Sequence, residues 1–137
     1  MRTALDTNVI SSIWSGEPSE QAIRIALREA AAVGALVLCP VVYTELRAYP
    51  GVTRDFLDVF LDKTRISVDW DIDGAVWRLA AERFAMYADR RRESKGGTPK
   101  RLLADFVVGA HAVTRADRLM TLDRGRYERE FVELSIV

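Results

Sequence analysis

Short apolar runs alternate along the chain with longer stretches in which apolar residues recur every three or four positions. The apolar runs predict strands at residues 2–5, 35–39, 66–68, 119–122 and 131–137. The periodic stretches predict helices at 8–14, 18–34, 40–48, 71–92 and 101–115, another that begins at Thr53, and a helical turn at 125–130. Strands that alternate with helices favour an α/β fold in which a parallel sheet is covered on both faces.

Length and composition fit a single globular domain spanning residues 1–137. Hydrophobic residues make up 49% of the chain, and no segment approaches the ~20 apolar residues that a membrane span requires. Cys39 is the only cysteine, which excludes an intramolecular disulfide and a multi-cysteine zinc site. We expect a cytoplasmic protein, because the N-terminus lacks a signal-peptide pattern and a lone thiol suits a reducing compartment.

The net charge is zero, but one short region is strongly basic. Lys+Arg and Asp+Glu both number 20, so the overall charge gives no sign of a nucleic-acid partner. A basic cluster lies around the loop between the last two predicted long helices and comprises Arg90, Arg91, Arg92, Lys100 and Arg101. Such a cluster could contact phosphates, although the commoner role of a charge run is to keep a loop solvated.

Carboxylates stand where two of the apolar runs end. Asp6 follows the first predicted strand and Asp123 follows the fourth, and ligands of parallel sheets bind beyond the carboxyl ends of the strands. Glu45 lies on the helix after the second strand, and Asp105 lies near the start of the helix that feeds the fourth. All four can therefore reach one edge of the sheet. Three of them also have a local explanation: Asp6 and Asp105 as helix N-caps, and Asp123 as a turn residue before Gly125.

Four converging carboxylates would repel one another, and a divalent cation would relieve that repulsion. Oxygen ligands without cysteine or clustered histidine suit Mg²⁺ or Mn²⁺. Such an ion polarises a phosphoryl oxygen and lowers the pKa of a bound water, which points to hydrolysis of a phosphodiester. Thr7, Asn8 and Thr121 could orient the ligands or a water, although Thr7 and Asn8 serve equally well as helix-capping residues.

Two other residues with reactive side chains are expected to be structural. Cys39 ends an apolar run, so we expect its thiol to be buried. His111 is the only histidine and follows Asp105 by six residues, which places it on the opposite side of the predicted helix. We therefore expect a packed, hydrogen-bonded His111 rather than a ligand or a base.

Four segments, in this order and at these intervals, carry a family resemblance. They are Leu5-Asp6-Thr7-Asn8, Tyr43-Thr44-Glu45-Leu46, the stretch from Leu103 to Ala112, and the stretch from Met120 to Tyr127. Together they resemble the PIN-domain ribonucleases, and in particular the VapC-type toxins of toxin–antitoxin pairs. The resemblance extends over the whole chain.

The resemblance implies a three-layer α/β/α domain with a central parallel sheet of about five strands. It also implies a Mg²⁺- or Mn²⁺-dependent endoribonuclease that forms homodimers and is neutralised by a cognate antitoxin. The acidic quartet of the family falls on Asp6, Glu45, Asp105 and Asp123. Some relatives carry a further acid after the last position, where this chain has Arg124 and Gly125, which argues against a second metal ion. The basic cluster would then steer RNA toward the acids.

The sequence is also compatible with other functions. A PIN-like module could bind RNA or a protein without cutting. Aspartyl phosphotransferases also begin with a strand that ends in Asp, but they carry a second Asp two residues later, where this chain has Asn8. Neither a Gly-x-Gly-x-x-Gly turn nor a Gly-Lys-Ser/Thr loop occurs, which disfavours nucleotide binding. For an antitoxin, the candidate apolar contacts are Trp14, Phe56, Phe60 and Trp77.

Overall fold

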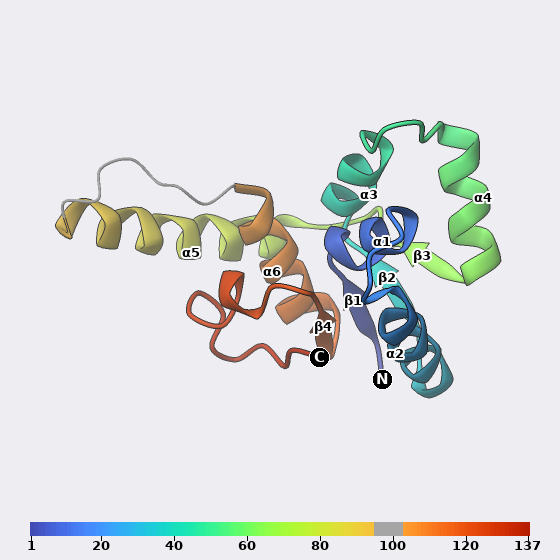
Figure 1. Cartoon of the computed structure of the whole chain (residues 1–137). Coiled ribbons are helices and arrows are strands. Elements are labelled where there is room, and N and C mark those ends of the chain that lie inside the picture. Colours follow the sequence, from blue (N-terminus) through green and yellow to red (C-terminus); the bar gives the residue numbers. More distant parts are fainter. Residues whose placement is uncertain (95–102) are drawn as a thin grey trace.

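The computed structural model describes residues 1–94 and 103–137, and in that part of the chain four parallel strands form one sheet. The strands are β1 (Thr3–Leu5), β2 (Leu36–Leu38), β3 (Ile66–Val68) and β4 (Arg118–Met120), in the order β3-β2-β1-β4. The helices are α1 (Thr7–Trp14), α2 (Glu20–Val33), α3 (Pro40–Arg47), α4 (Arg54–Thr64), α5 (Gly74–Glu93), α6 (Leu103–Arg115) and the short 3₁₀ helix η1 (Arg124–Arg126). The predicted α/β fold with a central parallel sheet is confirmed (Figure 1).

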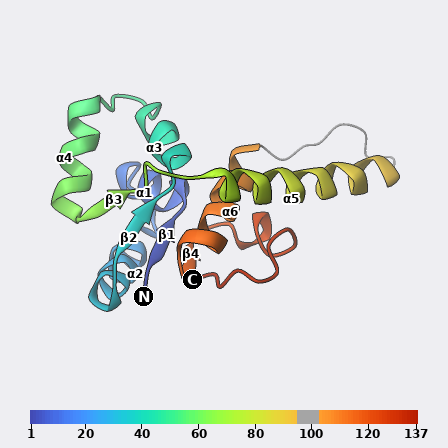
Figure 2. The ribbon, with the colours of Figure 1, turned by 180° about the vertical axis from the view of Figure 1, so that it is seen from behind.

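Helices lie on both sides of the sheet. Helix α6 packs against β1 and β4, and α5 packs along α6. Both views place α5 and α6 on one side of the strands and α2 and α4 on the other (Figures 1 and 2). Because both faces are covered, most strand side chains are buried and apolar, as expected of a buried parallel sheet.

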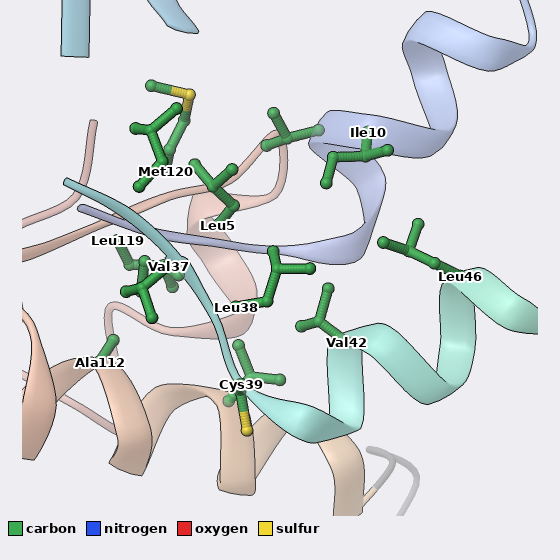
Figure 3. Close-up of a cluster of buried hydrophobic side chains, with 14 of the residues drawn as sticks. Leu5, Ile10, Val37, Leu38, Cys39, Val42, Leu46, Ala112, Leu119 and Met120 are labelled. Carbon is green, nitrogen blue, oxygen red and sulfur yellow. The ribbon is translucent and has the colours of Figure 1, made fainter. Parts of the chain in front are cut away.

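The core lies between the sheet and these helices. Leu5, Leu38 and Leu119 come from three neighbouring strands and are at most 1% exposed. Figure 3 shows such side chains on both sides of the strands, with Ile10 of α1 on one side and Ala112 of α6 on the other. The central strands are therefore fixed by packing on both faces, which sets the position of the residues at their ends.

Cys39 belongs to this core, as predicted. Its side chain is 1% exposed, and burial raises the pKa of the thiol to about 11 because the thiolate is poorly solvated there. The thiol stays protonated at neutral pH and serves as a small apolar group.

The C-terminal segment differs most from the expectation of a fifth strand at 131–137. It pairs with β4 at one bridge only, between Leu119 and Ile136. Phe131 instead turns inward against α6, where a Cβ added at Gly109 would lie only 2.3 Å from the phenyl ring. The predicted turn at 125–130 is likewise reduced to η1, and the helix predicted from residue 18 begins at Glu20.

His111 links α6 to the end of β3. It is fully buried, its Nε2 lies 3.1 Å from Oδ2 of Asp69, and Arg115 donates to the other oxygen of Asp69 over 3.2 Å. The prediction of a packed, hydrogen-bonded histidine is confirmed. Burial lowers the pKa of His111, and the nearby Asp69 carboxylate only partly offsets this effect.

The lowered pKa predicts that the fold loses stability in mild acid. In the unfolded chain, His111 binds a proton at about pH 6.5, whereas in the folded chain its pKa is lower. This contribution to stability is complete above that pH and is lost as the pH falls below it. Urea unfolding between pH 7.5 and 5.5 measures the effect. The slope should be shallower in His111→Gln than in the wild-type chain, and parallel slopes would show that His111 is not the group responsible.

Candidate functional site

Two of the predicted acids, Asp6 and Asp123, lie at the same edge of the sheet. The Asp6 backbone N–H donates to the carbonyl of Met120 over 3.0 Å, so the end of β1 is tied to the end of β4. Asp123 follows three residues after Met120. Since the strands are parallel, both acids lie beyond the carboxyl ends of neighbouring strands, as the sequence predicted.

Asp6 is buried and fully engaged. It is 3% exposed, and its Oδ1 accepts a hydrogen bond from the N–H of Thr7 over 2.8 Å, which caps α1. Its Oδ2 accepts from the hydroxyl of Thr121 over 2.8 Å and from the phenol of Tyr127 over 2.9 Å. A buried carboxylate costs several kcal/mol unless such donors compensate it. Three donors from three segments hold it in place here.

Tyr127 is a member of the site that the sequence analysis did not identify. The side chain is fully buried, and the pKa of its phenol is raised, mainly by burial and further by the negative charges of Asp6 and Asp105. The phenol therefore remains protonated and acts as a hydrogen-bond donor to Asp6.

The side chains of Thr7, Asn8 and Thr121 connect the segments around Asp6. Thr7 donates to Oε1 of Glu45 over 2.6 Å, which brings α3 against the start of α1. Asn8 accepts from the N–H of Leu122 over 3.1 Å. The Thr121 hydroxyl that donates to Asp6 also accepts from the N–H of Asp123 over 3.1 Å. All three residues therefore position the acids or the segments that carry them.

Arg126 lies among the acids and was likewise not identified from the sequence. Its Nε is 2.9 Å from Oδ2 of Asp123, and its Nη1 is 3.8 Å from Oδ1 of Asp105. Burial lowers the pKa of Arg126, but the charges of Asp105, Asp123 and Asp6 outweigh this and raise it overall. The guanidinium of Arg126 thus places one positive charge near three of the four predicted acids.

Hydrogen bonds and ion pairs join the four acids into one network, with Thr7, Thr121 and Arg126 as its links. Across residues 1–94 and 103–137, no group of three or more acidic, histidine or cysteine side chains is arranged to hold a metal ion as it stands. The donor set consists of carboxylate and hydroxyl oxygens, which suits a hard divalent cation. Arg126 would have to yield its contacts to such an ion.

A sequence signal for Arg126 and Tyr127 does exist. They follow Asp123 by three and four residues, a spacing that returns side chains to the same side of a helical turn. The turn η1 begins directly after Asp123 and brings both side chains back toward the acids. The apolar pattern alone could not reveal this, because the turn is short and its residues are mostly polar.

The predicted basic cluster lies away from the acids where the structure describes it. Arg90 binds Glu130, which is 6% exposed, over 2.5 Å, and Arg92 pairs with Asp89. These arginines belong to the last turns of α5, which reach the end of the molecule farthest from the sheet (Figures 1 and 2). Arg91 is half-buried in the same turns. Lys100 and Arg101 lie outside the described residues. Arg90 therefore serves to neutralise a buried glutamate.

Comparison with known proteins identifies the family. The sequence model of the PIN domain matches residues 3–131. The chain belongs to the PIN domain family. No curated protein matches the sequence significantly.

Solved structures share the PIN fold over nearly the whole chain. VapBC2 from Rickettsia felis, bound to a DNA fragment from its promoter, is similar with a TM-score of 0.69 and 19% identity, covering 100% of this chain and 98% of that one. VapBC-1 from nontypeable Haemophilus influenzae gives 0.67 and 18%, covering 100% and 97%. FitAcB from Neisseria gonorrhoeae gives 0.64 and 20%, covering 98% and 95%. At these identities the likeness concerns the fold.

The contact between Tyr127 and Asp6 predicts a specific loss of stability. Tyr127→Phe removes a donor from a buried carboxylate and should destabilise the fold by about 1–3 kcal/mol in urea unfolding. Tyr43→Phe is the matched control, because the Tyr43 phenol donates to the exposed carboxylate of Asp58. A loss no larger in Tyr127→Phe than in the control would refute the importance of this buried contact.

Proposed function

We propose that the protein is a metal-dependent endoribonuclease and the toxin of a VapBC-type toxin–antitoxin pair. The observation that carries the proposal is the network that joins Asp6, Glu45, Asp105 and Asp123 at the carboxyl edge of the sheet. Membership of the PIN domain family supports nuclease chemistry. The chain contains no competing histidine or cysteine cluster in the described residues.

The four acids are the residues that would hold Mg²⁺ or Mn²⁺. A bound ion would supply a Lewis acid for a phosphoryl oxygen and an activated water. The chain's own groups have positioning roles: Thr121 and Tyr127 fix Asp6, and Thr7 orients Glu45. A carboxylate held by second-layer hydrogen bonds loses less entropy when it binds a ligand.

The proposed partners are an RNA substrate, a cognate antitoxin and a second copy of the chain. The antitoxin is suggested by the structural neighbours, whose names denote VapBC pairs. On α4, Phe56 is 48% exposed and lies beside Phe60 and Trp14, which are half-buried. This aromatic cluster is the proposed antitoxin contact. Among the described residues, no helix is long and apolar enough to cross a membrane. The proposed location is the cytoplasm, a reducing compartment that suits the lone thiol of Cys39.

One observation favours the alternative of a PIN-like module that binds without cutting. Arg126 already pairs with Asp105 and Asp123, so part of the negative charge of the acids is offset without a metal ion. No such observation favours an aspartyl phosphotransferase. The position two residues after Asp6 holds Asn8, whose side chain accepts from the N–H of Leu122 and carries no carboxylate.

Cleavage of labelled single-stranded RNA with Mg²⁺ or Mn²⁺ decides between these functions. The wild-type chain should cut RNA, lose activity in EDTA, and recover it when the metal is restored.

Asp6→Asn should abolish cleavage, because it removes charge from the acid at the centre of the network. Thr121→Val should retain the fold and lower metal affinity or activity by about 10- to 100-fold. Equal cleavage by wild type and Asp6→Asn would reject the metal mechanism.

Substitution of Arg126 should strengthen metal binding, whereas Thr121→Val should weaken it. Arg126→Gln removes the internal cation that competes with a metal ion, so Mg²⁺ should bind more tightly to the RNA-free protein in calorimetry. Arg124→Gln is the control, since Arg124 pairs with the exposed Glu128 rather than with the site acids. If Arg126→Gln weakens Mg²⁺ binding relative to this control, Arg126 supports the metal site instead of competing for it.

A further inference from the structure

A hollow lies at the carboxyl edge of the sheet, beside α3. It encloses about 550 Å³ and is lined by Tyr43, Arg47, Arg54, Asp58 and Trp70. The Trp70 side chain is 60% exposed, and its ring meets that of Tyr43 edge to face, with centroids 4.9 Å apart and planes at 68°. An exposed tryptophan held against a tyrosine offers a flat, preformed surface to a planar ligand.

The polar groups of this hollow fix the Tyr43 ring and leave a net positive charge. The Tyr43 phenol donates to Oδ1 of Asp58 over 2.6 Å, and Arg54 pairs with the same carboxylate at 3.6 Å. Arg47 donates to the carbonyl of Val52 over 2.8 Å, which satisfies an N–H without cancelling the charge. Two arginines against one aspartate leave a net charge of about +1, a balance that favours an anionic ligand.

The position of the hollow relates it to the four acids. Trp70 follows β3, and β3 lies two strands from β1, the strand that ends in Asp6. At ~4.8 Å per strand, the two strand ends are about 10 Å apart along the same edge. Helix α3 lies between them: Tyr43 and Arg47 share one side of it, while Glu45 is turned by about 200° from Tyr43. One helix therefore presents Glu45 to the acids and an aromatic, basic face to the hollow.

We propose that this hollow binds an unpaired base of single-stranded RNA next to the cleavage site, with the base stacked on Trp70 and its phosphate near Arg47. The inference rests on the proposed function. Unpaired bases stack on aromatic side chains and their backbones pair with arginines, and this combination typifies single-strand recognition. A duplex would not expose a base to such a ring, so the site selects unpaired segments.

The direct test uses a short labelled single-stranded RNA and the Asp6→Asn protein, in which the proposed function predicts no cleavage. Adding Trp70→Ala should weaken binding by about 5- to 150-fold, the range expected for loss of one stacked base. Trp70→Phe should restore much of the affinity. Trp77→Ala is the matched control, because Trp77 is also exposed, lies on α5 and does not line the hollow. Arg47→Ala should weaken binding and reduce its dependence on salt.

In the otherwise wild-type chain, Trp70→Ala should raise KM while kcat changes little, because the ring binds substrate and does not contact the reacting bond. RNA affinity equal in Trp70→Ala and Trp77→Ala would overturn the inference while leaving the nuclease proposal intact. A change of oligomeric state in Trp70→Ala at unchanged RNA affinity would overturn it in favour of an interface between two copies. Trp70-dependent RNA binding without any cleavage by the wild-type chain would support this site and reject the nuclease.

Discussion

The site depends on one buried carboxylate, that of Asp6. It ends the strand β1, begins the helix α1, and accepts hydrogen bonds from Thr121 and Tyr127, which come more than a hundred residues later. Because an unsatisfied buried carboxylate would be costly, these contacts draw the chain after β4 back over the end of β1. The geometry of the acidic network follows from this requirement.

The second constraint is electrostatic. Bringing Asp6, Asp105 and Asp123 to one sheet edge concentrates negative charge, and Arg126 offsets part of it from within the chain. This internal cation relieves part of the repulsion without a metal ion, and the same contacts set a cost for binding one. Arg126 is therefore the group that an incoming cation would have to replace, and α3 is the element that connects Glu45 to the neighbouring aromatic hollow.

Much of the fold could be predicted from local patterns. The strands β1 and β4 and the acids after them stood out because their apolar runs end abruptly at charged residues. Tyr127 and Arg126 were missed because their roles exist only once the chain after β4 has folded back. Arg90 looked available for RNA in the sequence, yet it neutralises Glu130, a partner forty residues away. Contacts of that kind cannot be found from periodicity, since neither residue breaks the pattern of its own segment.

Crystals grown with Mn²⁺ give the most direct test of the central claim, because anomalous scattering locates the ion without reference to activity. We predict a single strong peak bounded by the carboxylates of Asp6, Glu45, Asp105 and Asp123, with Arg126 displaced from Asp105 and Asp123. A peak elsewhere, or saturating Mn²⁺ that leaves the Arg126 ion pairs in place and no ion among the four acids, would contradict the account.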